Sequence, residues 1–326
     1  MKDNVTILGT GAYGIALAKM FHENKQRITM WTRFIEEKNT LLETRENKKV
    51  LPGVIIDPEI KIIGNLEKAV KNADILVIAV PSGAVRELME EVKNYLRERT
   101  IVVIAAKGID NKTGKFMSEI VEKYVSKEKI VVISGPSFAI DVVSKQPTGL
   151  TIASENKSSM RRVSKALQNR YLRLVPSRDV LGVEVCGSVK NIMAIASGML
   201  YGFNANESCN AMFLTEAMHE IKNLLKELGC NDRTVLSYAG IGDLLLTCTS
   251  SKSRNFTFGY KLVKEKDTVA EYRKNTTIEG LYTLESIKKL IQRKEIDMPI
   301  INVIDSIVNK AENPKKLLKY LIKKAI

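Results

Sequence analysis

The sequence predicts an α/β amino-terminal domain built on a doubly wound, mainly parallel sheet, followed by an all-α carboxy-terminal domain. In the first half, short β-branched runs alternate with amphipathic helical stretches, which is typical of β-α-β units. Two of these runs, residues 75–80 and 101–105, are apolar throughout, as strands covered by helices on both faces should be. After residue 178 the segments show helical spacing and almost no strand pattern.

The individual elements follow from these patterns. Strands are expected at residues 5–8, 27–31, 61–63, 75–80, 101–105 and 130–134, with two further short strands at 149–153 and 171–175. The main helices of the second half are expected at residues 180–200, 207–228, 279–294 and 299–311, punctuated by glycines, Pro299 and Pro314. We therefore expect an α/β domain at 1–178 and a helical domain at 179–326.

Length and composition agree with this division and exclude several classes. A chain of 326 residues exceeds the size at which one hydrophobic core usually stops growing. The chain starts without a secretory signal pattern, and no uninterrupted apolar stretch approaches the roughly 20 residues that span a bilayer. We expect a soluble, cytoplasmic protein with no membrane span.

The net charge of +14 raises the question of nucleic-acid binding. The lysines, however, are spread along the chain and mixed with glutamates, as in residues 119–129, which is typical of solvated helix faces. We expect no nucleic-acid partner, and at most some attraction of anionic ligands.

The cysteines and histidines give no sign of a metal site. Cys186, Cys209, Cys230 and Cys248 lie far apart without a C-x-x-C pair, and are expected to be reduced core thiols. With two histidines in the chain, a histidine metal cluster is not expected, so acid-base chemistry must use other residues.

A glycine-rich turn carries the first functional signal. Gly9, Gly11 and Gly14 form G-x-G-x-x-G, with Ala12 and Tyr13 between the last two glycines, directly after the first strand and before a helix. In this context the glycines allow a tight turn and close approach of a pyrophosphate to a helix N-terminus, so a Rossmann-like dinucleotide site is expected. The alternative is a tight turn with packing glycines.

The second strand ends in Thr32-Arg33, where NAD-selective proteins usually place an acid against the adenosine ribose. A guanidinium at this position can meet a 2′-phosphate and stack on adenine. We therefore favour NADPH as the cofactor, with NADH also used. The alternative is a surface arginine.

Two isolated charges mark a candidate catalytic site. Lys190 is the one charged residue between Val185 and Asn206, beside an apolar stripe at helical spacing, and burial is expected to lower its pKa towards that of a working base. Asp243 is the one charged residue between Thr234 and Ser251. The two charges are expected to pair, with Asp243 orienting Lys190. The alternative is a buried salt bridge without a catalytic role.

Further candidates are anion-binding groups. Ser253, Arg254 and Asn255 precede an apolar helical run at 256–263, so that hydroxyl, guanidinium, amide and helix N-terminus suit a phosphate. The alternative is an ordinary N-cap at Ser253. Lys107 follows the strand at 101–105, where ligands of doubly wound sheets lie, and can bind a substrate phosphate or oxygen or be a solvated loop lysine.

These residues resemble the NAD(P)-dependent glycerol-3-phosphate dehydrogenase family, particularly its bacterial type. The likeness covers nearly the whole chain and rests on the segments 9–14, 105–108, 134–139, 189–191, 239–249 and 253–255. Tyr13 stands where many relatives have Trp, and Ser137 where some have Thr, and both preserve the stacking or hydroxyl group.

The resemblance implies roles for individual residues. Lys190 would be the proton acceptor or donor, with Asp243 and Lys107 also in the catalytic site. The substrate would be held by Lys107, Gly135, Ser137, Lys190, Asp243, Ser253, Arg254 and Asn255. The cofactor would be contacted by Ala12, Tyr13, Arg33, Lys107, Ala139, Arg254, Thr277 and Glu279.

The expected reaction is reversible hydride transfer between NAD(P)H and dihydroxyacetone phosphate, giving sn-glycerol 3-phosphate for glycerophospholipid synthesis. The resemblance also makes a homodimer the assembly to test. Two alternatives stay open: a related two-domain 3-hydroxyacid or sugar-acid dehydrogenase, and a non-catalytic dinucleotide-binding or nucleic-acid-binding protein.

Overall fold

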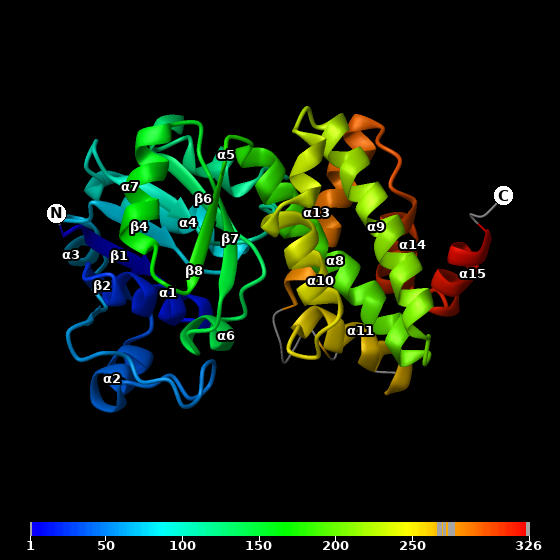
Figure 1. The fold of residues 1–326 in the computed structure, drawn as a ribbon, viewed down its shortest axis with the longest axis horizontal. Helices are drawn as coiled ribbons and strands as arrows, with labels where there is room; N and C mark the ends of the chain where they lie inside the picture. Colours follow the sequence, from blue (N-terminus) through cyan, green and yellow to red (C-terminus); the bar gives the residue numbers. More distant parts are fainter. Residues whose placement is uncertain (1, 266–268, 270–271, 273–277, 324–326) are drawn as a thin grey trace. The chain divides into compact units, whose positions relative to one another are not determined.

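The computed structural model describes residues 2–265, 269, 272 and 278–323. The chain forms two compact units (Figure 1). One unit comprises Met1–Lys107 and Met117–Val180, and the other comprises Gly108–Phe116 and Leu181–Ile326. The short excursion Gly108–Phe116 was not predicted from the sequence. Its side chains Ile109 and Phe116 belong to the hydrophobic core of the second unit, which explains why the segment joins that unit.

The first unit is built on an eight-stranded sheet in the order β3-β2-β1-β4-β5-β6-β7-β8. Its strands are β1 (Asn4–Leu8), β2 (Arg27–Trp31), β3 (Lys61–Ile63), β4 (Ile75–Ile78), β5 (Ile101–Ile104), β6 (Ile130–Ser134), β7 (Thr148–Ala153) and β8 (Leu172–Ser177). Every neighbouring pair is parallel except β6 and β7, which are antiparallel. The predicted doubly wound, mainly parallel sheet is confirmed. Pro176 lies in the edge strand β8, where proline is tolerated in a sheet.

Helices flank this sheet (Figure 1). They are α1 (Ala12–Glu23), α2 (Ile35–Thr44), α3 (Leu66–Val70), α4 (Ser82–Val92), α5 (Met117–Val121), α6 (Ala139–Val143) and α7 (Lys157–Leu167). Val77 of β4 packs in one core cluster with Phe21 of α1 and Val163 of α7. The next side chain along the strand, Ile78, is also fully buried and points to the opposite face. Burial on both faces explains why the central strands read as continuous apolar runs.

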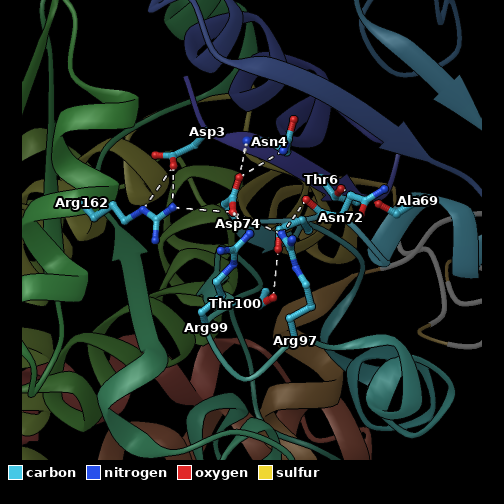
Figure 2. Close-up of polar contacts among 11 residues, drawn as sticks. Asp3, Asn4, Thr6, Ala69, Asn72, Asp74, Arg97, Arg99, Thr100 and Arg162 are labelled. Carbon is cyan, nitrogen blue, oxygen red and sulfur yellow. Dashed lines mark hydrogen bonds and ion pairs between the residues drawn. The ribbon is translucent and has the colours of Figure 1, made fainter. Parts of the chain in front are cut away.

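An ionic network lies at the end of the sheet where β1 and β4 begin (Figure 2). The Asp74 carboxylate accepts hydrogen bonds from the backbone and side-chain amides of Asn4, at 3.0 and 3.2 Å, and from Arg97 at 3.2 Å. Arg162 of α7 donates to Asp3 at 2.7 Å and lies 3.7 Å from Asp74. The hydrogen bond to Asp3 raises the pKa of Arg162. The network therefore joins β1, β4 and α7 at the edge opposite the strand ends that carry the candidate site.

Beyond residue 180, the described part of the second unit contains helices and loops and no strand. Its α-helices are α8 (Val180–Gly202), α9 (Glu207–Glu227), α10 (Asp243–Cys248), α11 (Arg254–Lys264), α13 (Glu279–Lys294), α14 (Pro299–Lys310) and α15 (Lys315–Lys323). The four long helices predicted here are all present, whereas α15 was not predicted.

Helix α8 forms the centre of this unit, and glycines let α11 approach it closely. A Cβ added at Gly198 would lie 2.0 Å from the Phe256 carbonyl oxygen, and one added at Gly259 would lie 1.9 Å from that of Ile195. No side chain fits at either position, so the backbones of α8 and α11 are in direct contact. This contact fixes the carboxy-terminal half of α8 against the start of α11.

Helix α8 is also long and apolar enough to cross a membrane by length and composition, with a mean hydropathy of 1.4. However, 89% of this apolar segment is buried inside the protein, as in the core helix of a soluble protein. Lys190 interrupts its apolar run, which is why the sequence predicted no span.

Helix α14 is held by a buried carboxylate. Glu220 of α9 is 5% exposed and accepts the backbone N–H groups of Ile300 and Ile301 at 2.8 and 3.0 Å. Pro299 occupies the first turn, where its missing N–H costs no hydrogen bond. The negative charge therefore satisfies two backbone donors at the positive end of the helix.

Candidate functional site

The turn between β1 and α1 has the shape that a dinucleotide phosphate requires. Gly9 has φ +117°, and an added Cβ there would lie 2.7 Å from the Ala79 carbonyl oxygen. At Gly14 the added Cβ would lie 2.4 Å from the Gly9 oxygen. At Gly11, by contrast, it would meet nothing within 4 Å. The first and third glycines are thus required by packing, while the second keeps an approach to the N-terminus of α1 open. This turn fits a pyrophosphate.

Other predicted residues gather beside this turn. The Tyr13 hydroxyl lies 3.1 Å from the Ser137 hydroxyl, which also donates to the Gly135 carbonyl at 3.1 Å. The Lys107 ammonium donates to the same carbonyl at 3.4 Å. Gly135 has φ +153°, and a Cβ there would lie 2.9 Å from the Gly149 oxygen. The structure therefore brings Tyr13, Lys107, Gly135 and Ser137 together at the carboxyl ends of β5 and β6.

Ala12 and Ala139 are the first residues of α1 and α6, and these two helices lie against each other. Both alanines pack against the core cluster of the first unit. Their backbone amides are in the first turns of the two helices, where amides without an intrahelical partner can meet an anion.

Arg33 follows β2 and is about half exposed. Its guanidinium donates to the Glu91 carboxylate of α4 at 2.7 Å, and its carbon lies 5.8 Å from the centroid of the Trp31 ring. The side chains of Arg33 and Glu91 are 53% and 46% exposed. The guanidinium therefore contacts both an aromatic ring and a carboxylate. The contact with Glu91 was not predicted, because the two residues are far apart in the sequence.

A carboxylate also lies at the glycine turn, where the sequence indicated none. Glu37 of α2 accepts from the Thr10 hydroxyl at 2.6 Å, from the Thr32 hydroxyl, and from the Asn47 side-chain amide at 3.0 Å. The Asn47 amide also donates to the Thr10 carbonyl at 3.1 Å. Glu37 thus ties the turn to the end of β2. The sequence signal that could have pointed to Glu37 is its position shortly after Arg33, in the first turn of α2.

In the second unit, the two isolated charges form a buried ion pair. The Lys190 ammonium of α8 lies 2.6 Å from the Asp243 carboxylate at the start of α10, and the side chains are 10% and 2% exposed. It also donates to the Thr247 hydroxyl at 2.8 Å, and this hydroxyl donates to the Asp243 carbonyl at 2.6 Å. Thr247 was missed, although it lies one turn after Asp243 on the same helix.

This pairing changes the expectation for the lysine. Burial alone favours a neutral amine, whereas a carboxylate at hydrogen-bonding distance favours the ammonium. The pairing therefore favours the ammonium form, which is held in place by two oxygen acceptors. Nearby, burial raises the pKa of the Cys248 thiol, with a smaller opposing effect from Lys190, so this thiol stays neutral.

Of the four cysteines, Cys186 and Cys248 are buried and Cys209 and Cys230 are half-buried. The prediction of core thiols is correct for the first two. The other two pack at the margin of the core instead, since they lie near the exposed ends of α9. Among the described residues, no group of three or more His, Cys, Asp or Glu side chains is arranged to hold a metal ion.

The last group of candidates surrounds the N-terminus of α11. Ser253 caps this helix, and its hydroxyl accepts the Phe256 N–H at 3.3 Å, as the N-cap alternative predicted. Arg254 is exposed, whereas Asn255 is 8% exposed. The Asn255 side-chain amide donates to the side-chain oxygen of Asn191 at 3.0 Å, and its own side-chain oxygen accepts the Gly280 N–H at 2.9 Å.

This amide network joins α8, α11 and α13. Asn191 is the next residue after Lys190, and Gly280 is the next after Glu279, the first residue of α13. The network therefore places Glu279 close to the start of α11. Thr277 lies outside the described residues.

Comparison with known proteins identifies relatives of both halves of the chain. A family model of the NAD-dependent glycerol-3-phosphate dehydrogenase N-terminus matches residues 4–160, and one of the corresponding C-terminus matches residues 179–319. A glycerol-3-phosphate dehydrogenase [NAD(P)+] from Staphylococcus aureus (strain USA300 / TCH1516) is 37% identical over 324 residues, covering 98% of each chain. One from Staphylococcus haemolyticus (strain JCSC1435) is 35% identical, covering 96% of this chain and 95% of the relative.

A solved structure extends the likeness to three dimensions. The crystal structure of glycerol-3-phosphate dehydrogenase from Coxiella burnetii superimposes with a TM-score of 0.92 at 29% sequence identity. The match covers 99% of both chains. Fold and sequence therefore agree along the whole length.

Proposed function

The chain belongs to the NAD-dependent glycerol-3-phosphate dehydrogenase family, and on this premise we propose how its residues carry out the reaction. The chain is an NAD(P)-dependent oxidoreductase that interconverts dihydroxyacetone phosphate and sn-glycerol 3-phosphate. The nicotinamide cofactor, when bound, supplies or accepts the hydride at C2 of the substrate. The protein's own residues bind both molecules and move the proton.

Lys190 is the proposed proton donor and acceptor. In the reductive direction its ammonium donates a proton to the substrate's C2 oxygen, which carries the negative charge that develops as the hydride arrives. Asp243 and Thr247 hold the ammonium in place through the 2.6 and 2.8 Å contacts. The buried ion pair is the single observation that carries this assignment. A buried ammonium keeps its charge only where it is paired, and the pairing with Asp243 therefore keeps a proton on Lys190.

The remaining candidate residues are proposed to bind the cofactor and the substrate, both of which carry anionic groups. The proposed cofactor contacts are the turn Gly9–Gly14, Arg33, Lys107, Ala139, Arg254, Thr277 and Glu279. The proposed substrate contacts are Lys107, Gly135, Ser137, Ser253, Arg254 and Asn255, together with the ion pair. Support comes from the open approach at Gly11, from the cluster around Gly135 and from the N-terminus of α11. Residues 1–178 would bind the dinucleotide, and residues 179–326 would supply the proton and bind substrate.

Three finer assignments belong to the same proposal. NADPH is preferred over NADH, since Arg33 stands where NAD-selective proteins place an acid. The enzyme acts in the cytoplasm, where its product enters glycerophospholipid synthesis. It forms a homodimer, which equilibrium sedimentation of the purified chain will test.

The direct test follows absorbance at 340 nm while dihydroxyacetone phosphate is added to the purified chain with NADPH or NADH. Lys190→Met removes the proton donor while keeping an unbranched side chain of similar length. Lys222→Met is the matched control, because Lys222 forms an exposed ion pair with Asp232 at 3.5 Å in the same unit.

We expect oxidation of NADPH by the wild type and by Lys222→Met, and a fall in kcat of about 10²-fold or more in Lys190→Met. Oxidation of NADPH only with 3-oxoacids or oxo sugar acids would instead favour the related two-domain dehydrogenases, which reduce these compounds to hydroxyacids. DNA retention that falls steeply with salt, without turnover, would favour a nucleic-acid-binding protein.

A further inference from the structure

We propose that Glu91 sets how strongly this chain discriminates NADPH from NADH, because it holds and partly neutralises the guanidinium of Arg33. The inference rests on the proposed contact between Arg33 and the 2′-phosphate of NADPH. It adds a carboxylate that competes for Arg33. This carboxylate comes from α4, which is far from Arg33 in the sequence, and the sequence alone did not indicate the contact.

The geometry around Arg33 is specific. Its guanidinium donates to Glu91 at 2.7 Å, and its carbon lies 5.8 Å from the centroid of the Trp31 ring. Arg33 follows the end of β2, which is where doubly wound proteins bind the adenosine ribose. A 2′-phosphate that binds the guanidinium must therefore share it with the Glu91 carboxylate or displace that carboxylate.

The other acid near the end of β2 does not compete in this way. Both carboxylate oxygens of Glu37 accept hydrogen bonds from neutral donors, which are Thr10, Thr32 and Asn47. In the described part of the chain, Glu91 is the acid that forms an ion pair with Arg33. The charge that the 2′-phosphate meets at Arg33 is therefore set by Glu91.

The size of the effect follows from exposure. With side chains 53% and 46% exposed, the ion pair is of the surface type, whose coupling is usually weak. A dianionic phosphate gains that coupling when the carboxylate is neutralised. We expect Glu91→Gln to tighten NADPH binding by about two- to fivefold and to leave NADH binding unchanged.

The experiment is isothermal titration calorimetry, which measures the affinity of the purified full chain for NADPH and for NADH. The proteins compared are the wild type, Glu91→Gln, Arg33→Gln and the double variant. Glutamine keeps the shape and an oxygen acceptor of Glu91, so it changes mainly the charge. Glu90→Gln is the matched control, because Glu90 lines the same open pocket on α4 but contacts Lys93 and Tyr124 instead.

The expected pattern has three parts. Glu91→Gln tightens the binding of NADPH and not that of NADH. Arg33→Gln weakens the binding of NADPH more than that of NADH. In the Arg33→Gln background, Glu91→Gln has no effect. The gain in Glu91→Gln shrinks as salt is raised, because both groups are exposed. Glu90→Gln matches the wild type.

The contrary results are distinguishable. If Arg33→Gln weakens NADPH but Glu91→Gln does not tighten it, this inference is wrong and the role of Arg33 stands. If Glu91→Gln tightens NADPH equally without Arg33, the carboxylate acts through the general field and the inference is again wrong. If Arg33→Gln leaves NADPH binding unchanged, the proposed contact itself fails, and the inference fails with it.

Discussion

Replacing Asp243 by asparagine should leave the Lys190 ammonium buried without its counter-charge. The two groups are 2.6 Å apart and their side chains are 2% and 10% exposed, so water cannot take over the role of the carboxylate. Asparagine keeps the size of the side chain and its carbonyl oxygen. The variant therefore isolates the charge on Asp243.

The magnitude has a lower and an upper bound. Removing one partner of a buried ion pair typically costs about 3–5 kcal/mol. A lysine can avoid a larger cost by losing its proton, which at pH 7 requires about 4.6 kcal/mol for a side chain that titrates near 10.4 in water. We expect a loss of about 3–4.6 kcal/mol, a large part of the roughly 5–15 kcal/mol by which domains are stable.

The pH dependence gives the sign of the effect. In the variant the folded state favours neutral lysine, whereas the unfolded state keeps the ammonium up to about pH 10. The unfolded state then binds more protons, so the variant's free energy of unfolding rises with pH. The deficit relative to wild type should therefore shrink as pH is raised from 7 to about 10.

The assay is urea unfolding at several pH values, combined with kcat for the reduction of dihydroxyacetone phosphate. Asp232→Asn is the control, because its ion pair with Lys222 is exposed and should contribute about 1 kcal/mol or less. We expect kcat to fall about 10²-fold or more in Asp243→Asn, since the proton donor is then neutral or misplaced. Asp243→Asn with wild-type stability, or with a deficit that grows with pH, would refute the reasoning.

Three further predictions follow from single contacts. Gly14→Ala should lose about 1–3 kcal/mol of stability by overpacking against Gly9, measured by urea unfolding, whereas Gly11→Val should unfold like wild type but bind NADPH at least about tenfold more weakly. Equal destabilisation of both variants would contradict the assignment of Gly11 to the ligand. Glu220→Gln should cost about 1–3 kcal/mol, because it removes the charge that accepts two N–H groups of α14, and an unchanged unfolding midpoint would show that the neutral amide suffices. Cys209, whose pKa burial also raises, should react with a thiol reagent in the native protein more slowly than in urea, and Cys248 should react only after unfolding. Rapid native labelling of Cys248 would contradict its burial.

Local patterns in the sequence determined most of the elements. The strand at 130–134 and the helix at 279–294 have the predicted bounds, because hydrophobic periodicity and end signals are properties of neighbouring residues. The glycine turn was equally readable, since each glycine's role depends on a strand and a helix that adjoin it in the chain. Lys190 and Asp243 could be singled out because a lone charge in an apolar run must find a partner.

For the other contacts between distant residues, only the tertiary structure decided which side chains meet. The sequence does not show which residues of α4 lie beside Arg33, so the contact with Glu91 could not be predicted from it. The role of Glu37 also depends on the fold, which brings Thr10 and Asn47 to its carboxylate. Gly108–Phe116 joins the second unit because Ile109 and Phe116 fit that unit's core.

The difference has one physical reason. Secondary structure depends on the period of the side chains, which each segment carries by itself. Ion pairs, hydrogen bonds and core contacts depend on the three-dimensional packing of segments that are far apart in the chain. The sequence therefore determined the elements, the glycine turn and the two isolated charges of this dehydrogenase, while the packing decided which acceptors surround each charge.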